Sequence, residues 1–358
     1  MGKIIAFYNH KGGVGKTTLV HNLSFALSDI GRNVLVIDAD PQMNLTAAMY
    51  GLSTAIEYSL EDDSKWLTYV DRYISLDEYI DTYLKDTESK KALFSRASEN
   101  NSKGNTDLIS GSINLPRIEA DLYGIVKNKN AYTEAIPHKF ERSVRDRAKE
   151  YDFVLIDMPP NAGSIINGLY IMSSDYFITP VSPTFFSLQA IDNLSAVVQN
   201  WIDLLSDYQT TKGKLGLSFN PKFLGIAVQL AKRFNSGAVN EITGYSRSTE
   251  EWIGDVNESV KRFVDFASVR RMTLTEEEFK NVFPDRTPFI IEKCCDFTPK
   301  LRAISEKEGV PVIHLTPEIC SKHDKKISIT SDKSQYCRSF ISISQSYQNI
   351  AENLLNLL

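Results

Sequence analysis

Short apolar runs alternate with segments of helical periodicity along most of the chain. KIIAFY (3–8), NVLVIDAD (33–40) and DFVLIDMPP (152–160) have the length of strands, and the last two carry aspartate where the apolar run ends. Between the first two, TTLVHNLSFALSDIG (17–31) spaces its leucines as one face of a helix would and closes on a glycine. Uninterrupted apolar runs are typical of parallel strands that are buried on both faces. The pattern predicts strand, helix and strand units.

The second half of the chain continues this alternation. YFITPVS (176–182), FLGIAVQ (223–229) and VPVIHL (310–315) are further predicted strands, and a helix is predicted from Ser187 to Leu205. The last segment, SYQNIAENLLNLL (346–358), places its apolar residues on one helical face. We therefore predict an α/β fold with a doubly wound, mostly parallel sheet, helices on both faces, and the active chemistry at the carboxyl ends of the strands.

Two segments do not fit a minimal version of this fold. Residues 55–105 are acidic at first and then polar through SENNSKGN, and we interpret them as an inserted helical subdomain that ends in a loop. Residues 235–295 are helical in pattern, and we interpret them as a second helical insertion. The prediction is one domain over residues 1–358 that carries both insertions.

Composition narrows the class of protein. The chain has 358 residues, of which 42% are hydrophobic and 24% are charged, so it can fold around a large core. A net charge of −5 argues against a surface that is basic throughout, and any site for a polyanion must be local. The sequence has no run of about 18 apolar residues, and its four cysteines show no C-x-x-C spacing. We therefore expect a soluble, cytoplasmic protein with reduced thiols.

The stretch NHKGGVGKTT (9–18) joins the first predicted strand to the first predicted helix. A loop that cradles phosphate needs glycines for close backbone approach, and a lysine after the last glycine reaches the terminal phosphates. Lys16 is that lysine, and Thr17 supplies a hydroxyl for Mg²⁺. The usual pattern G-x-x-x-x-G-K-[ST] has its first glycine where this chain has His10, and the chain adds a second lysine, Lys11. The predicted nucleotide-binding residues are Lys11, Gly12, Gly13, Val14, Gly15, Lys16, Thr17 and Thr18.

Carboxylates at the ends of two predicted strands supply the rest of the predicted site. Asp157 follows the apolar run of VLIDMPP, as a carboxylate that holds Mg²⁺ through water would. Asp38 and Asp40 follow the second strand in VIDADPQ. We predict that Asp40 orients the attacking water and that Asp38 supports the metal shell, because protein groups act in phosphoryl transfer mainly by positioning and by charge. The alternative is that these two acids cap the next helix.

Three motifs together carry a family resemblance. KGGxGKTT (11–18), DxDPQ (38–42) and the run that ends in IDMPP (156–160) resemble the deviant Walker A ATPases and, within them, the ParA/Soj partition ATPases. TDLISGSINLPRIEADL (106–122) and TPKLRAISEKEGVPV (298–312) extend the resemblance, which covers residues 1–52, 106–235 and 296–358.

The resemblance implies a function. In this family of phosphate-loop NTPases the cofactors are ATP and Mg²⁺, and the extra lysine reaches across a dimer to the partner's nucleotide. It therefore implies that Lys11 acts in trans, as a catalytic residue beside Lys16 and Asp40. It also implies a homodimer in the ATP-bound state, nonspecific DNA binding by that dimer, and release when a ParB-like or cargo adaptor protein stimulates slow ATP hydrolysis. The expected role is plasmid partition, chromosome segregation or cargo positioning, with nucleoid association in the ATP-bound state.

The resemblance also points to contacts outside the phosphate loop. Gln229 and Pro299 are the candidates for the nucleotide base, although VQLAKRF (228–234) departs from the Thr-Met-(Tyr/Phe)-Asp-like segment of relatives. The candidates for DNA contact are Lys232, Arg233, Lys300 and Arg302. The alternative for each of these four is an ordinary solvated charge.

Two other functions are open to this sequence pattern. A MinD-like membrane-cycling ATPase needs a basic amphipathic C-terminal helix, but no Lys or Arg follows Arg338, so we expect no membrane partner. A nucleotide-gated scaffold or regulator with weak hydrolysis could use the two insertions for its contacts. An electron carrier with a bridging cluster does not fit, because all four cysteines follow residue 290.

Overall fold

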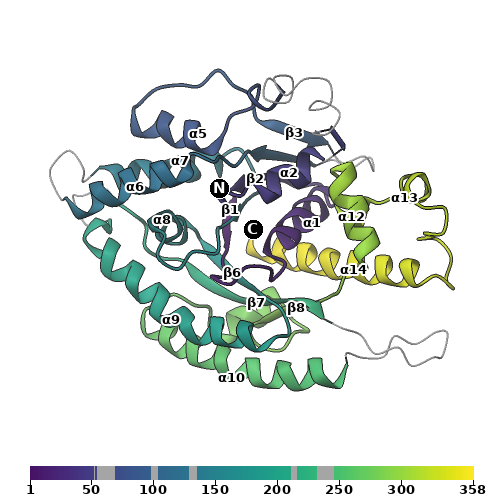
Figure 1. Cartoon of the computed structure of the whole chain (residues 1–358). Coiled ribbons are helices and arrows are strands. Elements are labelled where there is room, and N and C mark those ends of the chain that lie inside the picture. The colour runs from purple at the N-terminus through teal and green to yellow at the C-terminus, as the bar shows by residue number, and fades with distance from the viewer. Residues whose placement is uncertain (52, 55–68, 98–103, 129–134, 211–215, 232–245) are drawn as a thin grey trace.

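Figure 1 shows the computed structural model of the chain, in which one large sheet runs through the centre of the molecule. The structure describes residues 1–51, 53–54, 69–97, 104–128, 135–210, 216–231 and 246–358.

The sheet has eight strands in the order β3-β4-β2-β5-β1-β6-β7-β8. All neighbours are parallel except β3, which pairs antiparallel with β4 at one edge. Most residues of the central strands are fully buried, as expected for parallel strands covered on both faces. The strands are β1 (Lys3–Phe7), β2 (Asn33–Asp38), β3 (Phe94–Ala97), β4 (Asn105–Ile109), β5 (Phe153–Asp157), β6 (Tyr176–Val181), β7 (Lys222–Ala231) and β8 (Ile290–Cys295).

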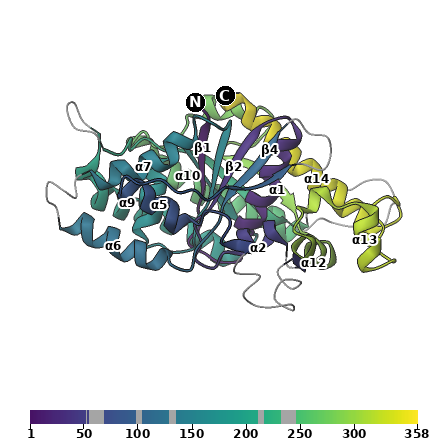
Figure 2. The ribbon, with the colours of Figure 1, turned by 90° about the horizontal axis from the view of Figure 1, so that it is seen from above.

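Helices cover both faces of the sheet. Seen from above in Figure 2, α1, α12 and α14 lie on one side of β1, β2 and β4, and α6, α7 and α9 lie on the other. The helices are α1 (Lys16–Asp29), α2 (Asn44–Tyr50), α5 (Leu76–Leu84), α6 (Leu115–Lys127), α7 (Ile136–Arg147), α8 (Ile165–Ser173), α9 (Phe185–Leu205), α10 (Arg247–Val269), α11 (Glu276–Val282), α12 (Pro299–Glu308), α13 (Pro317–His323) and α14 (Gln335–Leu354), with the 3-10 turns η1 (Ser206–Tyr208), η2 (Val312–His314) and η3 (Leu355–Leu357).

The register of the central strands brings their carboxyl ends to one level. Phe7, the last residue of β1, is the register partner of Asp157 in β5, and Asp157 is in turn the partner of Asp38 in β2. The chain leaves β1 and β2 at this edge toward α1 and α2. The sheet therefore gathers the phosphate-loop candidate and both strand-end aspartates, as the sequence predicts for a doubly wound fold.

One predicted strand is wrong. Residues 310–315 do not join the sheet, and Val312–His314 form the 3-10 turn η2. This turn packs against α1 and α14, and His314 Nε2 lies 2.7 Å from Oδ2 of Asp29 at the end of α1. Helices α1 and α14 bury the apolar residues of this turn. The prediction failed because a short apolar run does not by itself distinguish a strand from another buried segment.

The two predicted insertions have mixed structure. In the first, residues 55–68 and 98–103 lie outside the described part, α5 is helical, and β3 joins the central sheet beside β4. In the second, residues 235–245 lie outside it, α10 and α11 are helical, and β8 forms the other edge of the sheet. The domain boundaries stay a prediction.

Two expectations from composition can be compared with the structure. All four cysteines are buried and free, as predicted for reduced thiols. Among the described helices, none combines the length and the apolar character that a membrane crossing requires.

Candidate nucleotide site

The predicted phosphate loop lies between β1 and α1. Gly13 and Gly15 have φ angles of 74° and 81°, in the left-handed region that favours glycine. A Cβ at Gly15 would also lie 3.1 Å from Cβ of Gln229 on β7, whereas Gly12 has open space around it. Val14 is buried and anchors the loop. Gly15 caps α1 without any side-chain hydrogen bond, so the first N–H groups of this helix remain available to an anion.

Lys16 and Thr17 meet Asp157 where α1 begins. Thr17 Oγ1 donates a hydrogen bond of 2.7 Å to Oδ2 of Asp157, and Lys16 Nζ lies 3.9 Å from Oδ1. The Lys16 and Asp157 side chains are only 7% and 1% exposed. Oδ1 of Asp157 is buried and accepts no hydrogen bond from the described residues. The next residue, Thr18, continues the first turn of α1.

The two strand-end aspartates are held close together in the interior. Burial raises the pKa of Asp157 above its usual value, although Lys16 and Thr17 oppose the shift. Burial also raises the pKa of Asp38 to about 7, with a further contribution from the charge of Asp157. Two buried carboxylates repel one another, and a bound cation would relieve that repulsion.

These groups fit a Mg²⁺ ion. Magnesium takes oxygen ligands and is held by one or two carboxylates together with phosphate oxygens and water. Asp157 offers a buried oxygen without a hydrogen-bond donor, and Thr17 offers a hydroxyl beside it. No group of three or more His, Cys, Asp or Glu side chains suited to a metal occurs in the described ranges, so these residues do not form a dedicated all-protein cage.

Asp38 fastens α2 to the end of β2. Its Oδ2 accepts hydrogen bonds from the backbone N–H of Thr46 at 2.8 Å and from Thr46 Oγ1 at 2.7 Å. The same Oγ1 accepts from the N–H of Gly111, just after β4. Thr46 is in the first turn of α2, so the alternative that this acid caps the next helix holds for Asp38. Its predicted support of the metal shell stays a prediction.

Asp40 lies at the same edge of the sheet and is 6% exposed. Its Oδ1 accepts a hydrogen bond of 2.9 Å from the N–H of Gln42, and its own N–H donates to Oδ1 of Asp38 at 3.2 Å. The charge of Asp40 also contributes to the raised pKa of Asp157. The side chain is therefore close to the predicted metal position, where a water-orienting group is needed.

The Lys11 side chain contacts Thr184 and Phe186. Its Nζ donates a hydrogen bond of 2.7 Å to Oγ1 of Thr184, just before α9, and lies 5.3 Å from the ring centre of Phe186. Its backbone N–H donates to Oδ1 of Asn9. The two lysines of one loop thus have different surroundings, because Lys16 is buried beside Asp157 and the Lys11 contact with Thr184 is exposed.

The two candidates for base contact differ in exposure. Gln229 is 1% exposed and backs Gly15, and the hydroxyl of Tyr347 on α14 donates to its Oε1 at 3.1 Å. Its Nε2 is buried and has no partner among the described residues. Pro299 is exposed at the first position of α12. Contact of either residue with a base stays a prediction.

The candidates for DNA contact are not brought together as free cations. Lys232 and Arg233 lie outside the described residues. Lys300 Nζ lies 2.6 Å from Oδ2 of Asp324, and Arg302 Nε lies 2.9 Å from Oε1 of Glu306. Both described candidates are on α12, and their side chains are about half exposed. Their role in DNA contact stays a prediction.

Sequence reasoning missed the side chains that hold the site together. Thr46 binds Asp38 across 8 positions, Thr184 binds Lys11 across 173 positions, and Tyr347 binds Gln229 across 118 positions. Asn9 also links the loop to β6, because its Nδ2 donates to the carbonyl of Pro180. None of these partners belongs to a recognisable motif, and no signal in a single sequence identifies them.

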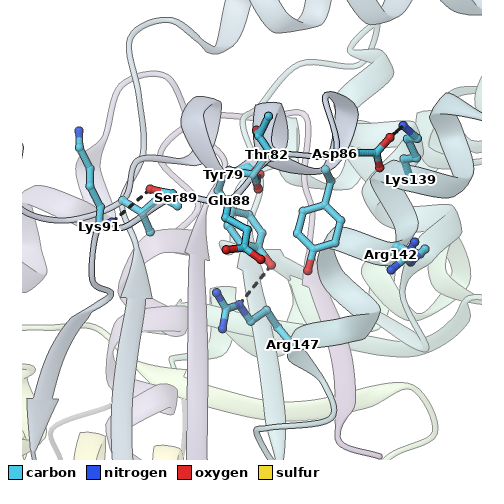
Figure 3. A pocket seen from close by; sticks show the side chains of 12 residues that line it. Tyr79, Thr82, Asp86, Glu88, Ser89, Lys91, Lys139, Arg142 and Arg147 are labelled. Atoms are coloured by element: carbon cyan, nitrogen blue, oxygen red, sulfur yellow. Dashed lines mark hydrogen bonds and ion pairs between the residues drawn. The ribbon is translucent and has the colours of Figure 1, made fainter.

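A separate polar pocket of about 360 Å³ lies between α5 and α7 (Figure 3). Its cations are already engaged: Lys139 pairs with Asp86 at 2.5 Å, and Arg147 donates to the hydroxyl of Tyr79 at 3.2 Å. Lys91 pairs with Asp71 and Glu78, which do not line the pocket. No residue predicted for nucleotide or metal lines this pocket, so we assign it no part in the candidate site.

Replacing Asp157 by asparagine should stabilise the nucleotide-free protein at high pH. The raised folded-state pKa means that the ionised carboxylate destabilises the fold above the usual pKa of 3.8, and that this cost is absent at lower pH. We expect Asp157→Asn to raise the melting temperature by about 2–4 °C at about pH 8 and to change it little near pH 4, with Asp203→Asn, an exposed aspartate, as the control. Destabilisation at both pH values would contradict this electrostatic assignment.

Comparisons with known proteins identify the family of the chain. The AAA domain family matches residues 2–209, which is more than half of the chain. Soj, the sporulation initiation inhibitor protein of Bacillus subtilis, is 30% identical over 200 residues, which cover 56% of this chain and 66% of Soj. The virulence plasmid ParA family protein pGP5-D of Chlamydia psittaci is 30% identical over 207 residues, which cover 57% of this chain and 67% of that protein.

A solved structure extends the comparison to the whole fold. The structure of pNOB8 ParA superposes with a TM-score of 0.58 at 17% identity and covers 100% of both chains, which shows a shared fold. The chain spans 64% to 66% of the length of Soj and of three uncharacterised curated relatives. The match over residues 2–209 and the identity to pGP5-D show that the chain belongs to the AAA domain family and, within it, to the ParA family of partition ATPases.

Proposed function

We propose that this chain is an ATPase that dimerises on binding ATP and Mg²⁺, binds DNA without sequence preference in that state, and is released when a ParB-like or cargo adaptor protein stimulates slow hydrolysis. In the cell this cycle would serve plasmid or chromosome partition, or the positioning of another cargo. Association with the nucleoid follows from DNA binding by the ATP-bound form.

The observation that carries the proposal is the separation of the two lysines of the phosphate loop. Lys16 is buried within 3.9 Å of Asp157 and is therefore committed to the site of its own chain. Lys11 is instead hydrogen-bonded at the surface to Thr184. A lysine that contacts Thr184 at the surface, and is not part of the buried pair of Lys16 and Asp157, supports a role at the nucleotide of a second subunit.

The side chains divide the work of phosphoryl transfer. Lys16 and the free N–H groups at the start of α1 bind the phosphates, because both present positive charge to an anion. Asp40 holds the attacking water in line, and Asp38 keeps α2 and the Asp40 backbone in place. Thr17 and Asp157 would hold Mg²⁺, which when bound neutralises charge on the phosphates. Lys11 from the other subunit supplies a further positive charge.

A structural neighbour supports the DNA step. pNOB8 ParA, which shares the fold, has also been solved bound to nonspecific DNA, and the relative pGP5-D is a ParA family protein of a virulence plasmid. The direct test is sedimentation of the full chain with random-sequence duplex DNA at low salt, with ATP and without it. Co-sedimentation only with ATP is the expected result. Hydrolysis without ATP-dependent DNA binding would favour a nucleotide-gated scaffold.

Replacing Lys11 by alanine should uncouple ATP binding from dimerisation. The isolated subunit keeps Lys16 and should still bind ATP, but two facing nucleotides repel one another when no lysine crosses between them. We expect Lys11→Ala to bind ATP with an affinity within about threefold of wild type and to form the ATP-dependent dimer at least about 10-fold more weakly, a change of about 1.4 kcal/mol. Light scattering with ATP measures the dimer.

A matched variant separates this role from local structure. Thr184→Val removes the hydrogen bond that Lys11 makes within its own chain and leaves the lysine in place. This control should dimerise at least as well as wild type. A normal ATP-dependent dimer of Lys11→Ala would overturn the assignment in trans, and weakened ATP binding by its monomer would show that Lys11 acts on its own nucleotide.

A further inference from the structure

The connection between α13 and α14 carries a group of lysines that the site does not use. We call residues 325–333 the lysine loop, because Lys325, Lys326 and Lys333 are all exposed there. Figures 1 and 2 both place α13 at one end of the molecule, beside α12 and the start of α14. The loop therefore projects from the same end of the fold as the predicted DNA residues of α12.

The three lysines of the lysine loop differ from the basic residues of α12. Within the described residues, no salt bridge holds the ammonium group of any of the three. Lys326 is nevertheless near Asp324, because its backbone N–H donates to Oδ1 of Asp324 and its charge helps to lower the pKa of that carboxyl. Lys300 and Arg302 are each paired with a carboxylate at 2.6 Å and 2.9 Å. A cation that already has a carboxylate partner must break that pair before it can neutralise a phosphate.

The lysine loop has a defined shape despite its exposed charges. Ile327 and Ile329 point inward and are only 4% and 6% exposed. The carbonyl of Asp324 accepts from the N–H of Ile327, and the N–H of Ser334 donates to the carbonyl of Ser331. The two buried isoleucines and these turns fix the backbone of the loop. The backbone therefore loses less conformational freedom on binding than that of a flexible segment would.

We propose that the lysine loop is a DNA contact surface, in which Lys325, Lys326 and Lys333 neutralise backbone phosphates of double-stranded DNA independently of sequence. This inference rests on the proposed function and specifies where its DNA binds. Lys300 then acts as a positioning residue, because its pair with Asp324 ties α12 to the residue just before the loop. The overall charge of −5 makes such a local cationic surface necessary for any polyanion.

The exposed chemistry of the loop favours DNA over a membrane. Besides the lysines, its exposed residues are Thr330, Ser331 and Asp332, and hydroxyl groups are common partners of DNA phosphates. A surface that inserts into lipid needs apolar side chains beside its cations, but both isoleucines of the loop are buried. An acidic lipid surface is therefore an alternative outcome for the experiment.

The test is a salt titration of DNA binding by the full chain with Mg²⁺ and a nonhydrolysable ATP analogue. Fluorescence anisotropy of a labelled random-sequence duplex gives Kd at each salt concentration. Each phosphate contact contributes about −0.9 to the slope of log K against log salt, so Lys325→Gln, Lys326→Gln and Lys333→Gln together should reduce that slope by about 2.7. Each single variant should reduce it by about 0.9, and affinity at low salt should fall at least about 10-fold in the triple variant.

The control removes the same charge elsewhere. Lys90, Lys127 and Lys280 are also exposed, and their triple change to glutamine gives the same net charge, −5 less 3, or −8. This control should keep the wild-type slope, and both triple variants should keep wild-type ATP hydrolysis and dimerisation. Equal losses in the two variants would mean that net charge alone matters, and an unchanged slope in the loop variant would mean that DNA binds elsewhere; either result overturns the inference and leaves the proposed function standing.

Two further measurements separate the assignment of the lysine loop from the proposed function on which it rests. If the wild-type chain hydrolyses ATP but never binds DNA at low salt, the DNA part of the proposed function fails and the inference fails with it. Vesicles containing phosphatidylserine should not bind the wild-type chain. Vesicle binding that the loop variant loses, without DNA binding by either protein, would assign the loop to a membrane and overturn the DNA assignment.

Discussion

Lys16→Ala should abolish ATP binding, with an affinity at least about 100-fold below that of wild type. Lys16 is 7% exposed and provides the positive charge nearest to Asp157 at the start of α1. Truncating one partner of a buried, hydrogen-bonded charge pair between a protein and its ligand costs about 2–5 kcal/mol of binding free energy, and about 2.8 kcal/mol already corresponds to 100-fold in Kd. The same change removes the charge that would meet the terminal phosphates.

Two measurements make the Lys16 result interpretable. Isothermal titration with ATP and Mg²⁺ gives the affinity, and thermal unfolding shows whether the variant is folded, because Asp157 loses its nearby cation. Lys11→Ala is the matched control, since it removes a lysine from the same loop and should still bind ATP as a monomer. ATP affinity that is unchanged in a folded Lys16→Ala protein would contradict the phosphate-loop assignment.

Asp40→Ala should leave ATP binding intact and slow hydrolysis by about 100-fold or more, as the loss of a group that positions water does. Asp40 lies at the carboxyl edge of the sheet, where its charge acts on Asp157. Of the two carboxylate oxygens of Asp40, only Oδ1 accepts a hydrogen bond from the described residues, and its donor is the N–H of Gln42. Because binding and dimerisation use other residues, the variant should accumulate as an ATP-bound dimer.

A conservative variant separates water positioning from local structure. Asp40→Asn keeps an oxygen that can accept from Gln42 but loses the negative charge, so it should slow hydrolysis nearly as much as alanine and melt at the wild-type temperature. Phosphate release in a single turnover measures the chemical step apart from ADP release. Turnover at the wild-type rate in both variants would mean that another group orients the water.

Local patterns determined the fold class and the centre of the site. The buried strands ending at Phe7, Asp38 and Asp157 follow uninterrupted apolar runs, because parallel strands covered on both faces have no polar side. The order of strand, glycine loop and helix places Lys16 at the start of α1, since all three are adjacent in the chain, whereas its neighbour Asp157 comes from β5. The family resemblance rests on the same short motifs and is confirmed by the match over residues 2–209 together with the identity to pGP5-D.

Short patterns failed where burial came from distant elements. The apolar run at 310–315 is of strand length, yet it is covered by α1 and α14 and turns as a 3-10 helix. The antiparallel strand β3 was not predicted in the first insertion, because an edge strand of four residues leaves little periodic signal.

The sequence by itself determined which residues form the phosphate loop, which aspartates end strands, and that the chain folds as an α/β protein. Only the tertiary structure decided that Asp38 is fastened by Thr46, that Lys11 rests on Thr184, and that Gln229 is buried beneath Gly15 against Tyr347. The physical reason is that motifs and periodicity report on neighbours within a few positions, whereas hydrogen-bond partners and burial depend on which strands and helices the sheet order brings together.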